Sequence, residues 1–372
     1  MKVIAFYLPQ FHTIPENNEW WGEGFTEWVN VKKAKKYYNW QRQPRIPLKN
    51  NYYNLLDKHT QEWQANLAQE KGIYGFCYYH YWFDGHMLLE KPMENMLKNN
   101  NIKLPFCICW ANEDWTNAWV SDNAKTLITQ TYGDKNEWGK HYIYLSKFFK
   151  DSRYIIENNK PLFVIYRPEI IPCLNDMLIY WNELAKKDGF DGIKFAHQSA
   201  GLDYPVKKDD SLFDYDIEMQ PAYAKINSIG ISKRRKKDRI LRFLQITHLD
   251  WVRRLIRKKN GPQVFDYNQI WETAINTPPL SKKSIPCAFV DFDNTSRRRE
   301  QGWLFKGVSI QKFENYFEKY LIKSINQYDS DKMFIFAWNE WAEGGYLEPD
   351  EDNQFGYLDS IYKVLKKHNQ LE

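Results

Sequence analysis

Residues 333–343 have the sequence MFIFAWNEWAE, an apolar run that passes directly into polar and aromatic residues. A short continuous apolar run rich in Phe and Ile is typical of a strand that is buried on both faces. Seven other segments share this character, namely residues 3–11, 73–83, 105–113, 161–168, 192–198, 212–221 and 286–294. The chain therefore contains eight candidate buried strands.

Segments with helical spacing of apolar residues separate these strands, and the clearest are residues 57–71, 88–98, 138–150, 173–187 and 312–327. Alternation of buried strands with helices indicates a parallel sheet that is covered on both faces. Eight such units predict an α/β chain folded as a single (β/α)8 TIM barrel over residues 1–372. An open nucleotide-binding sheet is less favoured, because the sequence has no G-x-G-x-x-G or Walker motif.

Composition and charge separate one segment from the rest of the chain. The chain is 43% hydrophobic and 17% aromatic, which excludes a disordered protein, and its formal net charge is +5. Residues 232–260 contain twelve Lys or Arg and only two Asp. We therefore expect a basic, partly helical insert after the sixth strand, at about 225–280. Such a helix either packs on the barrel as a solvated helix or contacts an anionic membrane, and no motif supports nucleic-acid binding.

Compartment and cofactors are predicted from what the sequence lacks. The apolar run near the N-terminus is too short for a signal peptide, and no run of about 18 apolar residues occurs. The five cysteines fit reduced core thiols. We expect a cytoplasmic protein, peripheral at the inner membrane face if the basic insert binds lipid. No metal-binding motif is present, so we expect neither a metal nor a cofactor.

Polar and aromatic residues gather at the ends of the predicted strands, where a (β/α)8 barrel builds its active site. Aromatic rings pack on the C–H face of a sugar, and planar polar groups bind its hydroxyls. Each single residue could equally be structural, but the same combination recurs at successive strand ends. The predicted substrate-binding residues are Tyr7, Gln10, His12, Tyr79, His80, Trp110, Asn112, Glu113, Tyr166, Arg167, Glu218, Asp293, Asn294 and Trp338.

Glu340 and Glu343 form the most informative carboxylate pair. Two carboxylates beside a scissile bond are the usual machinery of glycoside hydrolysis. Residues three apart on a strand face opposite ways, so the pair requires the chain to turn after Glu340, which Gly344 and Gly345 make easy. The alternative is one solvated glutamate beside a structural one. Other candidate carboxylates are Glu23, Glu27, Glu113 and Glu218.

Several long motifs resemble those of the WbsX-like proteins, which carry a glycoside hydrolase family ninety-nine-like domain. They are residues 7–12, 20–22, 24–28, 75–82, 110–113, 160–163, 293–295 and 339–344, and together they extend over nearly the whole chain. The resemblance implies a (β/α)8 barrel that acts on glycans. Characterised hydrolases of the family cleave α-mannosides with retention, through a 1,2-anhydro sugar. By motif position, Glu340 would take the proton of the 2-hydroxyl and Glu343 would be the acid/base.

Ala342 occupies a position where the eukaryotic endomannosidases have His, so the chain is closer to the WbsX-like branch. That branch accompanies surface-polysaccharide assembly and is often called glycosyltransferase. We expect a retaining glycoside hydrolase or transglycosylase, endo-α-mannosidase-like, acting on a mannose-containing or related bacterial surface polysaccharide or its lipid-linked precursor. The alternatives are a glycosyltransferase of O-antigen or capsular polysaccharide biosynthesis, and a non-catalytic glycan-binding protein.

Overall fold

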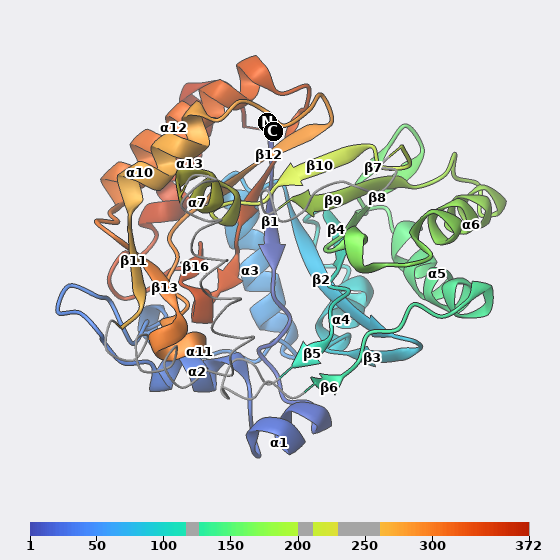
Figure 1. Cartoon of the computed structure of the whole chain (residues 1–372), viewed down its shortest axis with the longest axis horizontal. Coiled ribbons are helices and arrows are strands. Elements are labelled where there is room, and N and C mark those ends of the chain that lie inside the picture. The colour runs from blue at the N-terminus through green and yellow to red at the C-terminus, as the bar shows by residue number, and fades with distance from the viewer. Residues whose placement is uncertain (117–125, 200–210, 230–260, 372) are drawn as a thin grey trace, which may run out of the picture.

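The computed structural model describes residues 1–116, 126–199, 211–229 and 261–371 (Figure 1). Its central sheet is a closed parallel barrel, because consecutive strands pair along the chain and the last pairs with the first. The barrel strands are β1 (Lys2–Tyr7), β2 (Gly75–Phe83), β4 (Phe106–Trp110), β8 (Lys160–Ile165), β9 (Lys194–Ser199), β10 (Tyr215–Glu218), β12 (Ser284–Phe289) and β14 (Lys332–Phe336). All eight lie within or overlap the predicted segments, so the predicted (β/α)8 barrel is confirmed.

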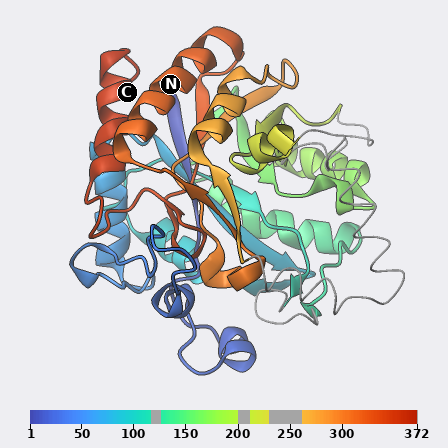
Figure 2. The ribbon, with the colours of Figure 1, turned by 60° about the vertical axis from the view of Figure 1, so that its left-hand side comes forward.

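Helices surround the barrel. They are α3 (Lys58–Glu70), α4 (Lys91–Lys98), α5 (Lys135–Phe149), α6 (Leu174–Lys187), α10 (Tyr267–Asn276), α12 (Ile310–Gln327) and α13 (Gly356–Lys367). The last two pack side by side (Figure 2), with the rings of Phe313 and Tyr357 5.3 Å apart. Several begin at a side-chain cap that binds an otherwise unpaired backbone N–H, as at Asp57, Asp134, Asp266 and Ser309. Among the described residues, no helix is both long and apolar enough to cross a membrane.

Short elements fill the loops between these units. They are α1 (Pro15–Trp21), α2 (Glu27–Lys33), η1 (Leu48–Asn50), β3 (His86–Leu88), β5 (Trp115–Thr116), β6 (Thr126–Ile128), β7 (Ile156–Glu157), η2 (Pro168–Ile170), α7 (Ala222–Ile229), β11 (Gln263–Asp266), α11 (Thr295–Arg298), η3 (Arg299–Gln301), β13 (Trp303–Lys306), β15 (Asn339–Glu340), η4 (Trp341–Glu343) and β16 (Gly345–Tyr346).

The predicted basic insert is only partly within the described chain. Residues 230–260, which include its most basic stretch and the expected membrane contact, lie outside the described residues. The C-terminal part of the predicted range contains α10, which packs on the barrel. The ring of Trp271 stacks on that of Phe289 of β12, with centroids 4.2 Å apart. This helix therefore packs on the outer face of β12, the seventh barrel strand, as the helices of a (β/α)8 barrel do.

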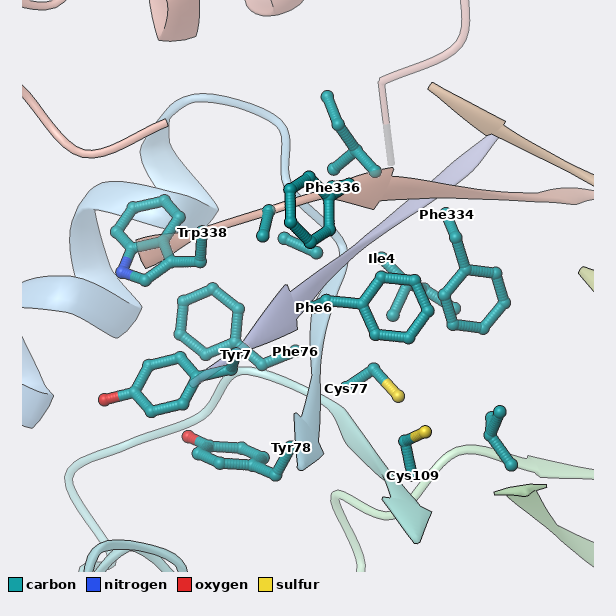
Figure 3. Packing of buried hydrophobic residues seen from close by; sticks show 14 of the residues in the cluster. Ile4, Phe6, Tyr7, Phe76, Cys77, Tyr78, Cys109, Phe334, Phe336 and Trp338 are labelled. Atoms are coloured by element: carbon teal, nitrogen blue, oxygen red, sulfur yellow. The ribbon is translucent and has the colours of Figure 1, made fainter. Parts of the chain in front are cut away.

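Side chains along each strand alternate between the barrel interior and the surrounding helices. On β1, Phe6 faces the interior, where its ring lies 5.2 Å from that of Phe334 of β14. Tyr7 faces the helices instead, and its hydroxyl donates to Gln64 of α3 over 2.7 Å. Figure 3 shows Phe334 on one side of β1 and Tyr7 on the other. This alternation decides which strand-end residues can reach a site in the barrel mouth.

Two asparagines extend the barrel hydrogen bonding beyond the strand ends. Asn339 accepts from the backbone N–H of Leu8 at 2.7 Å and donates to the carbonyl of Leu8 at 3.0 Å, which joins the last strand to the first. Asn112 forms the same pair of bonds with the backbone of Arg167, both at 2.8 Å. Both asparagines are fully buried. Each side chain thus substitutes for a missing pair of ladder bonds.

Replacing Asn339 with Ala should lower the free energy of unfolding by about 2–4 kcal/mol, because it leaves a buried N–H and a buried C=O of Leu8 without partners. Equilibrium urea unfolding monitored by tryptophan fluorescence measures the loss. Asn66→Ala, at an exposed position of α3, is the matched control and should change stability by less than about 0.5 kcal/mol. Equal unfolding midpoints for the two variants would contradict the bridging role of Asn339.

Candidate active site

A cleft of about 820 Å³ opens at the carboxyl ends of the barrel strands. Each barrel strand, or the loop that follows it, supplies at least one of the described lining residues. Taken in order from β1 to β14, they include Gln10, Tyr79, Glu113, Tyr166, Gln198, Gln220, Asn294 and Glu340. This is the end of the barrel at which the strand-end residues predicted a site.

A buried guanidinium lies in the wall of this cleft with three carboxylates around it. The Nε of Arg297 lies 3.0 Å from Glu27, its Nη2 lies 3.1 Å from Glu340, and its Nη1 lies 3.0 Å from Glu343. The side chain of Arg297 is only 8% exposed. Because one planar cation contacts both Glu340 and Glu343, these two carboxylates face the same small volume of the cleft.

Local backbone geometry brings the two glutamates together. Glu340 ends β15, and the chain then turns through η4, so that Glu343 does not point away as it would on a strand. Gly344 follows with φ of +65°, and a Cβ there would lie 2.9 Å from the backbone nitrogen of Asp293. That nitrogen donates to the carbonyl of Glu343 at 2.7 Å. The turn predicted after Glu340 is therefore present, and only glycine fits its end.

The two carboxylates differ in exposure. The side chain of Glu343 is 18% exposed, whereas that of Glu340 is 7% exposed. Burial raises the pKa of Glu340 to about 8, and the positive charge of Arg297 opposes this rise. Glu340 is therefore a stronger proton acceptor than an ordinary carboxylate, while Glu343 is better placed to exchange protons with the cleft.

Aromatic rings and amide side chains form much of the remaining surface. Phe292 and Trp303 stack with centroids 3.8 Å apart and both line the cleft. The other aromatic lining residues are Trp21, Phe25, Tyr79, Tyr81, Phe83, Trp115, Tyr166 and Phe336. The lining amides are Gln10, Asn17, Asn30, Gln198, Gln220, Asn294 and Gln301. This combination suits a ligand with apolar faces and many hydroxyls.

The structure brings some of the predicted site residues into this cleft. They are the two glutamates together with Gln10, Tyr79, Glu113, Tyr166 and Asn294. Glu27, considered among the other carboxylates, also lines it. Glu23 lies at an exposed position and accepts from Asn18 at 3.1 Å.

Other predicted residues face the helices and do not line the cleft: Tyr7, His80, Trp110, Glu218 and Trp338. Their polar atoms are used in the packing. The His80 imidazole meets a histidine of α5 at 3.0 Å, and the Glu218 carboxylate accepts from a tyrosine hydroxyl after α12 at 2.6 Å. In the structure these five side chains do not line the cleft: the four that belong to strands lie on the outer faces, because strand residues alternate, and Trp338, which follows β14, packs its ring 5.0 Å from that of Phe76.

The remaining predicted residues are buried or paired in the loops. Asn112 bridges two strand ends as described above, and Arg167 forms ion pairs with two glutamates of nearby loops. Asp293 accepts from Gln41 at 2.8 Å. His12 bonds the carbonyl three residues before it at 3.0 Å. These side chains shape the loops around the cleft instead of lining it.

Arg297 is the central residue that the sequence did not predict. It lies in the run Arg297-Arg298-Arg299, which by itself resembles a solvated charge cluster. One signal in the sequence could have identified Arg297 as a site residue. It lies three residues after Asn294, at a strand end that was predicted to carry site residues. Within the described parts of the chain, no group of His, Cys, Asp or Glu has the arrangement of a metal site.

Comparison with known proteins shows which family the chain belongs to. The family described as glycosyltransferase WbsX matches residues 3–361. Two relatives called uncharacterized protein WxcX, from two strains of Xanthomonas campestris pv. campestris, are 30% identical to the chain over 367 residues. The alignment covers 98% of this chain and 50% of each relative, so the chain spans about half the length of the curated relatives it matches.

Solved structures of similar fold include a GH99 endo-alpha-mannosidase from Bacteroides thetaiotaomicron in complex with BIS-TRIS-Propane. Its TM-score is 0.58 at 12% identity, with 99% of this chain and 98% of that chain covered. A glycoside hydrolase-like protein has a TM-score of 0.54 at 11% identity, with 98% and 93% covered. At these identities the likeness shows the barrel fold alone. The resemblance found in the motifs is confirmed by the match over most of the chain: the protein belongs to the family described as glycosyltransferase WbsX.

Proposed function

We propose that the chain is a retaining glycoside hydrolase or transglycosylase. Its substrate would be a mannose-containing or related bacterial surface polysaccharide, or the lipid-linked precursor of one. The observation that carries the proposal is the contact of both Glu340 and Glu343 with Arg297 in an aromatic, amide-rich cleft. Two carboxylates that address one sugar supply the acid and base that glycosidic cleavage requires. The similarity of the barrel to the GH99 endo-alpha-mannosidase named above supports the same class of chemistry.

In the proposed mechanism, Glu340 accepts the proton of the sugar 2-hydroxyl while that oxygen attacks the anomeric carbon. Glu343 donates a proton to the departing glycosidic oxygen, and a 1,2-anhydro sugar forms. Glu343, now ionised, then takes a proton from water or from an acceptor hydroxyl, which opens the anhydro ring at the anomeric carbon. Glu340 returns its proton to the 2-oxygen. Two inversions at one carbon give net retention, and all protons balance.

Arg297 has a positioning role in this scheme. Its two Nη atoms fix the orientation of both carboxylates, and its charge allows more than one of them to remain ionised in a buried site. The Glu27 carboxylate contacts the Nε of Arg297 at 3.0 Å, and this contact restrains rotation of the guanidinium.

A glycosyltransferase is the second candidate, and the description of the family favours it. The same two glutamates could transfer a sugar from a glycoside or lipid-linked donor to an acceptor hydroxyl. A purely glycan-binding protein is less favoured, because it would not need two carboxylates on one guanidinium. The contact of residues 232–260 with an anionic membrane, at the cytoplasmic face, stays a prediction from the sequence.

Glu343→Gln should lower kcat on α-manno-oligosaccharides or on the host surface polysaccharide by about 10²–10⁴-fold, because the leaving oxygen loses its proton donor. Mass spectrometry of the products measures this and shows whether water or a sugar has been added. Glu70→Gln, at an exposed position of α3, is the matched control and should retain full activity. Unchanged turnover in Glu343→Gln would exclude the assigned acid/base. Products formed only with an activated sugar donor would replace hydrolysis by transfer.

The midpoint pH at which kcat/KM falls on acidification should lie well above the pKa of an ordinary glutamate. Glu340 must be ionised to accept the 2-hydroxyl proton, and burial raises its pKa to about 8, so the active fraction increases as pH rises towards 8. Initial rates between pH 4 and 9 on an aryl glycoside with a good leaving group would measure this midpoint. Glu343→Gln should keep this midpoint on that substrate. A midpoint near the ordinary glutamate value of about 4.3 would contradict the role of Glu340.

Arg297→Met should destabilise the protein by about 3–5 kcal/mol at neutral pH, because it leaves buried carboxylates without their cation. The loss should grow as pH rises above about 4.3, where the carboxylates of the unfolded chain ionise freely and the buried ones cannot. Thermal unfolding at a series of pH values measures both effects. Adding Glu27→Gln to the variant removes one uncompensated charge and should restore part of the stability. A pH-independent loss would argue against this electrostatic role.

A further inference from the structure

A buried carboxylate lies behind the turn that carries Glu340 and Glu343. It belongs to Glu348, which follows β16 by two residues and is only 2% exposed. Glu348 does not line the cleft but a second cavity, of about 450 Å³, whose wall it shares with the indole of Trp341. It therefore does not contact a ligand in the cleft, and any influence on the reaction has to pass through the turn.

Glu348 accepts hydrogen bonds from three side chains. Its Oε2 accepts from the Tyr53 hydroxyl at 2.7 Å and from the Trp341 indole at 2.6 Å. Its Oε1 accepts from the amide of Gln64 at 2.6 Å, and the Tyr7 hydroxyl donates to the oxygen of that amide at 2.7 Å. Because these side chains come from β1, α3, the loop before α3 and η4, the position of the carboxylate is fixed from several sides.

A carboxylate is costly to keep in this place. Burial raises the pKa of Glu348 to about 7, and the hydrogen bonds from Trp341, Tyr53 and Gln64 oppose this rise. These donors are uncharged, so they compensate the burial of an anion less completely than an ion pair would. An uncharged side chain of similar size would avoid the cost. A carboxylate that is costly to bury is typical of functional sites.

Trp341 connects the buried carboxylate to the reacting ones. It lies in η4, directly after Glu340 and two residues before Glu343. Its ring stacks on that of Tyr346 with centroids 3.8 Å apart, and it lies 5.4 Å from the ring of Trp28 in α2. Stacking permits a ring to slide in its own plane, whereas the hydrogen bond from the indole N–H to the buried carboxylate fixes it along that plane.

The turn is thus held by charged groups on two sides. On the cleft side, Arg297 contacts Glu340 at 3.1 Å and Glu343 at 3.0 Å. On the opposite side, Glu348 accepts from Trp341 at 2.6 Å. Loss of either contact would let the turn shift, and a displacement of about 1 Å can lower a rate by about 10²-fold.

We propose that Glu348 is a positioning residue, which holds the turn at Trp341 so that Glu340 and Glu343 address one sugar together. This inference rests on the proposed function and adds to it a group that acts on the reaction without contacting the substrate.

Trp341→Phe tests the contact, because it removes the indole N–H and keeps an aromatic ring beside Tyr346. It should lower kcat on α-manno-oligosaccharides or on the host surface polysaccharide by about 10–100-fold and leave KM within about threefold. Tyr53→Phe is the matched control: it removes a hydrogen bond from the same carboxylate oxygen without altering the turn, and should keep kcat within about twofold.

Two variants of Glu348 separate positioning from general stability. Glu348→Leu removes both acceptor oxygens and should lower kcat at least as much as Trp341→Phe. Glu348→Gln retains an oxygen that can accept from Trp341 and should recover most of the activity. If Glu348→Leu does not fold, Trp341→Phe decides.

Hydrogen–deuterium exchange gives a readout that does not depend on activity. The Gly344 N–H donates to the carbonyl of Trp341 at 3.1 Å, so peptides within residues 339–347 should exchange about tenfold faster in Trp341→Phe than in Tyr53→Phe. Full kcat in Trp341→Phe, or an equal loss in Tyr53→Phe, would overturn the role of Glu348 and leave the proposed function intact. Absence of turnover in the wild type would overturn the proposed function, and unchanged exchange would show that Glu348 does not hold the turn.

Discussion

The contact of one arginine with three glutamates is the constraint on which the cleft end of the barrel depends. Arg297 joins α2, the loop after β12 and the turn after β14, segments that lie far apart in the sequence. Three carboxylates this close together would repel one another and could not be buried as anions without a cation between them. The arginine therefore permits the fold to bury Glu27 and Glu340 and at the same time holds Glu343 at the cleft surface.

The barrel could be predicted from the sequence because its strands are buried on both faces. Their apolar runs are continuous, and the Asn, Gln and Glu residues that end them mark the carboxyl edge where a site forms. To decide which side chains of a predicted strand face the cleft, the alternation of residues along that strand must also be applied. Residues one apart on a strand face opposite ways, so Tyr79 lines the cleft while its neighbour His80 packs against α5. Applying this alternation separates Tyr7 and Trp110 from the residues that can contact a ligand. It does not separate Trp338, which lies beyond the end of β14 and two residues after the cleft-lining Phe336.

The central arginine was much harder to predict. Nothing in three successive arginines distinguishes Arg297, which is buried among carboxylates, from Arg298 and Arg299, which are exposed. The difference arises from tertiary contacts: Glu27 lies 270 residues away in sequence and Glu340 lies 43 residues away. The turn at Gly344 was easier to predict, since paired glycines after two glutamates indicate a change of chain direction. Local chemistry is thus visible in the sequence, whereas long-range charge compensation is not.

The family description names a transferase, whereas two carboxylates on one guanidinium favour a hydrolase, but the proposed mechanism accommodates both. Once Glu340 and Glu343 have formed the anhydro sugar, the leaving group has departed and Glu343 is ionised. The next step needs only a hydroxyl placed where Glu343 can take its proton. If that hydroxyl belongs to water the product is a hydrolysed glycan, and if it belongs to a sugar the product is a new glycosidic bond. Hydrolase and transferase would then share every catalytic group and differ only in whether the cleft binds an acceptor sugar tightly enough to exclude water.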